Sequence, residues 1–358
     1  MRKLIISLIV FILCFILLFF GIQSVLHYRW ANVDDFYSRN LDYAAQPSNS
    51  IDVLYFGSSE ILTGIEPVVL YEEEGITGYN FAISRRSAIA NYFSLLYTLK
   101  YQTPKLVVCD FSCMYDDNLP GEVEDVYRRM VECTPDKDLK SLMIKTICEL
   151  DPEQSYLSWR FPLLRYHSMW NELEEANFTK DYVYSETYPA YCKGAYWFDQ
   201  DYEGDMIDVT PDLWEYDEPE TSDDFSQISI EYYDKFIEEC HNRDIKVVAV
   251  LPPKISAAQS YAARWDAQKE YFADRDVYCL NYNTYEQFKK SGFNIERDYA
   301  DRSHLNVEGS IRFSKILAQD LKSNFGLTDH RGDEGFATNW DDSLREFNKL
   351  NDERMNRD

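Results

Sequence analysis

The chain has 358 residues, of which 45% are hydrophobic and 16% aromatic, and its formal net charge is −26. This length and composition allow a large core, in one α/β domain with insertions or in two smaller domains, and exclude a wholly disordered chain. The acidic charge excludes nucleic acid as a partner, because binding by counterion release needs a basic footprint. The eight cysteines show no short paired spacing with histidine, so we expect no metal site and no cofactor.

The N-terminus predicts a membrane anchor. Arg2 and Lys3 precede an apolar run from Leu4 to Leu26, and a helix of that length spans about 34 Å, enough to cross a hydrocarbon core of about 30 Å. A cleaved signal peptide is the alternative, but its apolar core is usually shorter and small residues follow at a cleavage site. The positive end predicts a single-pass protein of the cell membrane, with its N-terminus in the cytoplasm and everything after about Tyr28 outside.

Seven cysteines would then lie outside the cytoplasm, and an odd number cannot all pair within one chain. Cys109 lies in an apolar, strand-like run and is expected to be a buried thiol. A disulfide bond among the other six stays open, because spacing alone does not determine pairing. These six are Cys113, Cys133, Cys148, Cys192, Cys240 and Cys279.

The rest of the chain predicts an α/β domain. Residues 1–28 form the expected anchor, 29–50 a connector, 51–325 the domain, and 326–358 a charged tail with a peripheral helix. Within the domain, apolar runs alternate with turns and amphipathic stretches, which is typical of a parallel sheet with crossover helices. About five strands are expected, at 51–56, 77–83, 105–111, 245–251 and 277–282. Helices are expected near 88–99 and 307–321 and over 226–242 and 257–274.

This alternation is interrupted at about residues 114–225. The stretch is rich in acidic and aromatic residues and has no regular order of strands and helices. We therefore expect a largely helical and irregular insertion that covers the site.

Gly57-Ser58-Ser59-Glu60 directly follows the first expected strand. Ligands of parallel α/β sheets bind beyond the carboxyl ends of the strands. Glycine permits a tight turn there, and the next residues present hydroxyl and backbone N–H groups, as a nucleophile and its oxyanion hole require. The alternative is a plain helix cap, which is the commoner role of such a turn.

Asp301-Arg302-Ser303-His304 precedes the last expected helix, which Asn306 would cap. An aspartate three residues before a histidine can hold one imidazole nitrogen, so that the other can take a proton from a serine. A loop histidine with only structural bonds is the alternative. Of the other histidines only His167 competes as a base.

Together the two motifs resemble the SGNH/GDSL hydrolase family, whose fold is a doubly wound, flavodoxin-like parallel sheet. The resemblance spans about residues 51–321, apart from the insertion. The anchor, the GSSE sequence, the DFS after the third strand and the DxxHLNxxGS sequence more narrowly resemble the DltD-like branch. Members of that branch are bacterial, membrane-anchored proteins that work with membrane-bound O-acyltransferases to acylate polymers of the cell envelope.

The resemblance implies that Ser59 is the nucleophile, His304 the general base and Asp301 the residue that orients it. Ser58 then occupies the aspartate position of the GDS sequence. Where the family has a glycine whose N–H serves the oxyanion hole, this sequence has Ser84 or Arg85.

Two further regions have open alternatives. The family's third-block asparagine has no counterpart, and Ser112 or Met114 falls near its place. Asp110, which ends the third strand, either caps the following turn or supports the Ser59 loop, and we favour the cap. In the insertion, Arg165, Tyr166, His167 and Trp170 are either core residues, as aromatic stripes more often are, or the lining of an acceptor groove.

The leading hypothesis is an extracytoplasmic serine O-acyltransferase that modifies an envelope polysaccharide or teichoic-type polymer, with a membrane-bound O-acyltransferase as partner. The acidic charge favours a neutral or zwitterionic glycan over a polyphosphate. An esterase or deacetylase, in which water resolves the acyl-enzyme, is the second hypothesis. A non-catalytic accessory of the membrane-bound enzyme is the third.

Overall fold

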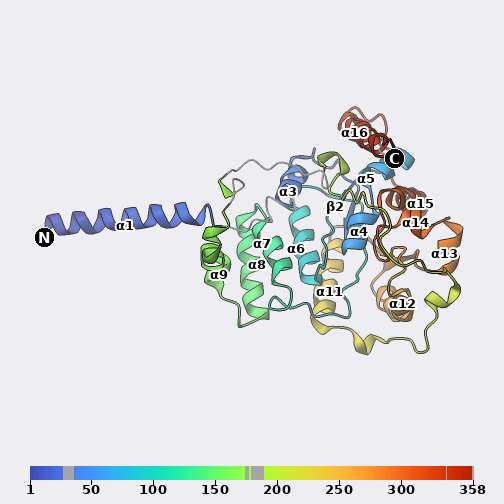
Figure 1. Cartoon of the computed structure of the whole chain (residues 1–358), viewed down its shortest axis with the longest axis horizontal. Helices are drawn as coiled ribbons and strands as arrows, with labels where there is room; N and C mark the ends of the chain where they lie inside the picture. The colour runs from blue at the N-terminus through green and yellow to red at the C-terminus, as the bar shows by residue number, and fades with distance from the viewer. Residues whose placement is uncertain (27–35, 174–176, 179–188, 336, 357–358) are drawn as a thin grey trace. The chain divides into compact units, whose positions relative to one another are not determined.

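The computed structural model describes residues 1–26, 36–173, 177–178, 189–335 and 337–356 (Figure 1). Its contacts divide the chain into two units. The anchor unit comprises Met1–Asn40 and Leu119–Val183, and the sheet unit comprises Leu41–Asn118 and Tyr184–Asp358. The expected insertion of about 114–225 is therefore divided: its middle belongs with the N-terminal segment and its last part belongs with the sheet.

The sheet unit contains a five-stranded, all-parallel sheet in the order β2-β1-β3-β4-β5. This order is doubly wound, with its switch point between β1 and β3. The sequence-based prediction of an α/β fold with about five parallel strands flanked by helices is confirmed, although each strand is shorter than its apolar run. The strands are β1 Val53–Phe56, β2 Gly78–Asn80, β3 Leu106–Cys109, β4 Lys246–Leu251 and β5 Val277–Asn281.

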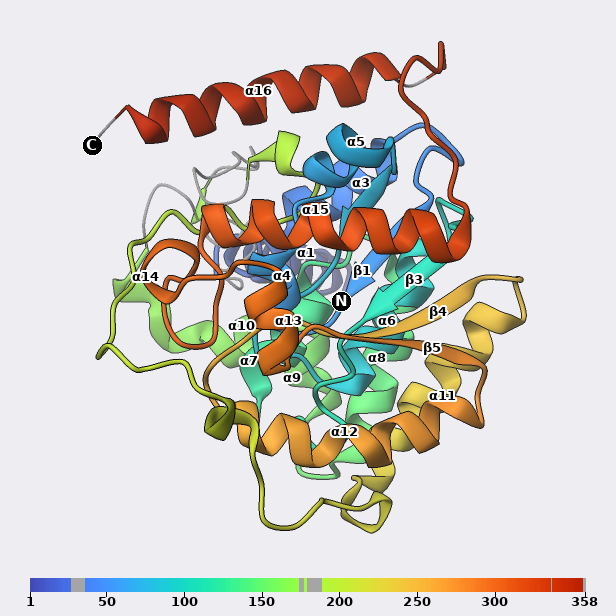
Figure 2. The ribbon, with the colours of Figure 1, turned by 90° about the vertical axis from the view of Figure 1, so that its right-hand side faces the viewer.

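Helices cover both faces of this sheet (Figure 2). Side chains alternate between the two faces of a strand. Val53 and Tyr55 of β1 belong to one core cluster with Phe313 of α15 (Val307–Phe325). Phe56 points the other way, and its ring lies 5.4 Å from that of Phe236 in α11 (Gln227–His241). Both faces are thus buried, which explains why the strands read as continuous apolar runs.

The four helices expected from periodicity are confirmed as α6 Ala88–Thr98, α11, α12 Ala258–Ala273 and α15. Shorter helices follow several strands. They are α4 Ser59–Gly64, α5 Pro67–Glu74, α13 Tyr285–Lys290 and α14 Ile295–Asp298, with 3-10 helices η3 Ala190–Cys192, η4 Pro211–Trp214 and η5 Ser222–Asp224.

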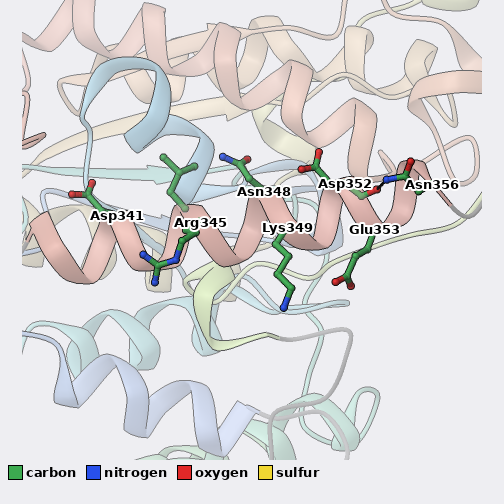
Figure 3. Close-up of a pocket in the computed structure, with 8 residues that line it drawn as sticks. Asp341, Arg345, Asn348, Lys349, Asp352, Glu353 and Asn356 are labelled. Atoms are coloured by element: carbon green, nitrogen blue, oxygen red, sulfur yellow. Dashed lines mark hydrogen bonds between the residues drawn. The ribbon is translucent and has the colours of Figure 1, made fainter.

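The C-terminal segment forms α16 (Ala337–Met355), whose inner face is well packed. Trp340 is 1% exposed and its ring lies 5.2 Å from that of Tyr71 in α5. Phe347 is buried against Trp197, with 5.3 Å between their rings. Leu344 and polar or charged side chains on an exposed face of α16 line a shallow hollow of about 600 Å³ (Figure 3). The expected charged tail is therefore an amphipathic helix with one buried face.

The anchor unit begins with α1 (Arg2–Gln23), which among the described residues is the one helix long and apolar enough to cross a membrane. Its other helices are shorter than α1, and the buried side chain of Arg128 lies among them. Arg128 is 3% exposed, donates to Glu124 over 3.0 Å and lies 3.7 Å from the ring of Trp159. The helices are α7 Glu124–Glu132, α8 Lys137–Leu150, α9 Tyr156–Arg160, α10 Leu163–Tyr166 and the 3-10 helix η1 His167–Asn171, and α3 Phe36–Ala45 begins in this unit.

All eight cysteines lie in the described part of the chain, and all are free thiols. Cys109 is fully buried in β3, as predicted. Burial, reinforced by the nearby Asp110 carboxyl, raises the pKa of this thiol well above its ordinary value, so it is a packing residue rather than a nucleophile.

Candidate active site

The turn after β1 brings Ser59 to the carboxyl edge of the sheet. Gly57 has φ +133, a conformation that side-chain-bearing residues rarely adopt. Ser58 then caps α4, and Ser59 is the first residue of that helix. The Ser58 N–H donates to Asp110 Oδ2 over 2.8 Å, which ties the turn to the end of the neighbouring strand β3. The Ser59 hydroxyl is thereby fixed at the rim, beside the switch point.

Gly57→Ala is expected to destabilise the protein. The backbone conformation alone costs about 1–3 kcal/mol for a non-glycine residue, and a Cβ at this position would lie 2.6 Å from Asp110 Cγ. We expect a lower thermal unfolding temperature together with a displaced Ser59. Gly335→Ala is the control, because no atom lies within 4 Å of its added Cβ. Equal unfolding temperatures for the two variants would contradict this account of the turn.

The loop between α14 and α15 carries His304 to the same edge. His304 Nε2 lies 2.8 Å from Ser59 Oγ, and His304 Nδ1 lies 2.8 Å from Asp301 Oδ2. The loop is closed by Ala300, whose N–H donates to the His304 carbonyl over 3.0 Å. Asn306 caps α15 as predicted, accepting from the Gly309 N–H over 3.1 Å. The two separate sequence motifs therefore meet in one hydrogen-bonded Ser–His–Asp row.

Charge and exposure in this row suit proton transfer. Partial burial acts to raise the pKa of Asp301, but hydrogen bonds from His304 and from the Ser303 N–H outweigh it, and the pKa is held below its usual range. Asp301 is therefore ionised at neutral pH and can hold the proton-bearing Nδ1 of the imidazole. The His304 side chain is 25% exposed and Ser59 is half-buried, so a substrate can reach the serine.

A buried polar cluster lies directly beside the serine. Ser58 Oγ lies 2.5 Å from Asp110 Oδ2 and also makes a short contact with Glu60 Oε2. Glu60 Oε1 accepts from Lys254 Nζ over 2.6 Å. Lys254 is 5% exposed and lies 4.0 Å from the centre of the Tyr261 ring. Residues from the ends of β1, β3 and β4 are thus joined under the nucleophile.

The cluster separates the pKa values of its two carboxyl groups. Burial acts to raise the pKa of Glu60, but the ammonium group of Lys254 outweighs it and holds that pKa below its ordinary value. Burial and then the Glu60 charge raise the pKa of Asp110. The single hydroxyl proton of Ser58 cannot serve both carboxyl groups at once, and the two groups differ in pKa because only Glu60 has a cation beside it.

Lys254→Met is expected to lower the free energy of unfolding by about 3–5 kcal/mol at neutral pH, because it leaves Glu60 buried without its cation. The difference from wild type should shrink in acid. Glu60 has a depressed pKa in the folded wild type, so its stabilising contribution is present above the unfolded pKa of about 4.3 and is lost as the pH falls through the folded value.

Denaturant unfolding of both proteins at pH 7 and near pH 3 measures this difference, since only the lower pH lies well below the unfolded pKa. Glu60→Gln combined with Lys254→Met is the matched variant and should recover part of the stability. A constant difference at both pH values would show that the ion pair is not its source.

The expected oxyanion residues lie on the loop after β2. The Ile83 N–H donates to the Gly57 carbonyl over 3.1 Å, which aligns this loop with the nucleophile turn. Ser84 follows, half-buried, and Arg85 is exposed with a left-handed φ of +57. The buried guanidinium of this loop belongs instead to Arg86, whose Nη2 donates to the Ala90 carbonyl over 3.0 Å.

Asp110 fills both roles that the sequence left open. It caps its own turn by accepting from the Ser112 N–H over 3.0 Å, and it holds the Ser58 turn through the bonds described above. Met114, the other candidate for the third-block position, is fully buried. Neither Ser112 nor Met114 carries a side-chain amide, so any donor from this segment would be a backbone N–H.

The insertion residues have local partners in the anchor unit. Arg165 Nε donates to Glu124 over 2.8 Å, and His167 Nδ1 lies 3.0 Å from the Leu164 carbonyl. Tyr166 is buried, as the core alternative predicts, whereas Trp170 is 70% exposed. None of these residues belongs to the unit that holds the Ser–His–Asp row.

Sequence reasoning missed Lys254. The loop after β4 contacts the His304 loop, because the Ile255 and Ser256 N–H groups both donate to the Arg302 carbonyl, over 2.9 and 2.7 Å. The available signal was its position: Lys254 directly follows the Pro252-Pro253 stop of the fourth strand, at the edge where Ser59 lies. Its pairing with Glu60 was not predictable, because the two residues are 194 positions apart in the sequence.

No protein-family model matches the chain, and no curated protein matches it in sequence. What the row can do chemically is clear from its parts: a hydroxyl, a base within hydrogen-bond distance and a carboxylate that orients the base.

Proposed function

We propose that the protein is a membrane-anchored serine acyltransferase that modifies a polysaccharide or teichoic-type polymer of the cell envelope. The observation that carries this proposal is the 2.8 Å contact between Ser59 Oγ and His304 Nε2, with Asp301 on the other imidazole nitrogen. The doubly wound strand order and the position of Ser59 after β1 agree with the SGNH and DltD-like resemblance, and so add support.

The proposed reaction has two half-reactions. Ser59 Oγ attacks the acyl carbon of a donor ester or thioester while His304 Nε2 takes the serine proton. The donor's leaving group departs with that proton, and an acyl-enzyme ester remains on Ser59. An acceptor hydroxyl then attacks this ester and gives its proton to His304, which returns it to the departing Ser59 oxygen.

The expected membrane anchor supports a location of the protein at the cell envelope. With α1 in the membrane and Arg2 and Lys3 at its cytoplasmic end, the sheet unit and the part of the anchor unit that follows α1 would lie outside the cytoplasm. A membrane-bound O-acyltransferase is the proposed partner, since it can supply an acyl group across the membrane. This part of the proposal rests on the resemblance and on the length and apolarity of α1.

An esterase or deacetylase is the second candidate. The observation that favours it is the partial exposure of the row, since the Asp301 side chain is 44% and that of His304 25% exposed, and water can resolve an acyl-enzyme that it can reach. Free carboxylic acid released by the purified protein without a partner would identify this function. An accessory without catalysis is the third candidate, motivated by the missing side-chain amide after β3.

Cells that lack the protein test the proposal. We expect wild type to restore alkali-labile acyl esters on envelope polymers and Ser59→Ala to restore none. Ser256→Ala is the matched control, because it removes a half-buried hydroxyl at the same edge of the sheet and should restore acylation in full. Full restoration by Ser59→Ala would exclude both enzymatic functions and leave the accessory.

A further inference from the structure

Large apolar side chains lie exposed on the short helices that follow α8. Tyr156 and Leu157 of α9 are 48% and 56% exposed, Leu164 of α10 is 48% and Trp170 of η1 is 70% exposed. Phe178, a few residues further on, is 66% exposed. We call these five residues the apolar collar. Large exposed apolar side chains on successive short helices commonly mark a protein or membrane contact.

The elements that carry the collar hold the C-terminal end of α1. The rings of Phe161 and Phe19 lie 5.6 Å apart. The Leu163 N–H donates to Gln23 Oε1 over 3.1 Å. Asn177, which is buried and directly precedes Phe178, donates to the Val25 carbonyl over 3.1 Å. Three separate contacts therefore join this segment to the last turns of α1 and to the residues directly after it.

These contacts fix the depth of the collar. A helix that enters the hydrocarbon at Leu4 crosses about 30 Å after about 20 residues, and so leaves it near Gln23. The Phe19 contact lies one turn inside that boundary and the Gln23 contact lies at it. The α9–α10 segment is consequently held where the hydrocarbon meets the lipid headgroups.

We propose that the apolar collar inserts into the outer interface of the same bilayer that holds α1. The inference rests on the membrane anchoring in the proposed function and is independent of the acyl-transfer chemistry. Trp and Tyr are the side chains enriched at this depth. Insertion would attach the anchor unit to the membrane at a second place besides α1.

Lipid, rather than a partner protein, is the occupant that the observations favour. Whenever α1 is in a membrane, the lipid around it also surrounds the collar. A partner protein would be an additional component that no contact of the collar requires. The net charge of −26 opposes attraction to anionic headgroups, so insertion is expected to depend on apolar and aromatic burial and to resist added salt.

The full-length protein in nanodiscs of zwitterionic lipid tests the proposal through tryptophan fluorescence. Trp30 follows α1 in the sequence and is replaced by Phe in every sample. We expect lipids brominated near the headgroup to quench part of the fluorescence, Trp170→Phe to remove most of that quenching, and 1 M NaCl to leave it unchanged. Trp265→Phe is the matched control, since Trp265 lies on α12 in the sheet unit, and it should retain the quenching.

Two outcomes would overturn the inference, and they are distinguishable. In the first, the protein enters nanodiscs but Trp170→Phe leaves quenching by brominated lipid unchanged and lowers only the quenching by iodide added to the water. The collar then faces water and is available to a partner protein. If the protein does not enter nanodiscs at all, the membrane anchoring fails and the collar proposal fails with it. Neither result bears on the reactivity of Ser59.

Discussion

Replacing His304 with alanine is expected to slow acylation of Ser59 by about 10⁴- to 10⁶-fold, the loss typical of removing the base from a serine triad. The reason is geometric: in the sheet unit, His304 Nε2 is the base placed 2.8 Å from Ser59 Oγ, and without it the hydroxyl keeps its proton. The measurement is the pre-steady-state burst of a chromogenic acyl ester with the purified full-length protein.

His241→Ala is the control for this variant, because His241 is exposed at the end of α11 and has no place in the mechanism. Added imidazole should restore part of the rate in His304→Ala, since it can enter the space left by the side chain and accept the proton. A burst rate within tenfold of wild type would contradict the role assigned to His304.

Asp301→Asn is expected to lower the acylation rate by about 10³- to 10⁴-fold with little change in KM, because the carboxylate acts through His304 and not on the substrate. An amide N–H facing Nδ1 turns that nitrogen into an acceptor and moves the imidazole proton to Nε2. The base then presents a proton to Ser59 where it should present a lone pair.

The matched control is Asp333→Asn. Asp333 also pairs with a histidine three residues away, His330 Nδ1 at 2.6 Å, but that pair has no contact with Ser59 among the described residues. We expect Ser59 in the Asp333→Asn variant to be acylated at the wild-type rate. If Asp301→Asn reacted at the wild-type rate while remaining folded, the carboxylate would have only the structural role of accepting the Ser303 and His304 N–H groups.

The α/β fold was predictable because both faces of the sheet are buried. Continuous apolar runs such as that at Val53–Phe56, separated by amphipathic stretches, leave few other arrangements. The position of Ser59 followed from the same rule, since the segment after a parallel strand lies at the carboxyl edge of the sheet. Its meeting with His304 was implied by the resemblance of the two motifs to a known family. Helix ends were also accurate where a capping residue marks them, as Ser226 does for α11 and Asn306 for α15.

The rest could not be read from the sequence, for physical reasons. Pairing of Lys254 with Glu60 depends on side-chain directions in two loops, which periodicity does not encode. The division of the insertion between two units depends on contacts such as that of Phe161 with Phe19, and these join segments far apart in sequence. Arg165 and His167 suit a sugar groove by residue type alone, and only the structure shows their local partners.

The most direct test of the central claim is whether Ser59 is an activated nucleophile. The full-length protein would be treated with a fluorophosphonate and the modified residue identified by mass spectrometry, beside Ser59→Ala and His304→Ala. We predict one adduct, on Ser59, which is absent from both variants. A protein that unfolds cooperatively, and so is demonstrably folded, but gives no adduct on Ser59 would contradict the account.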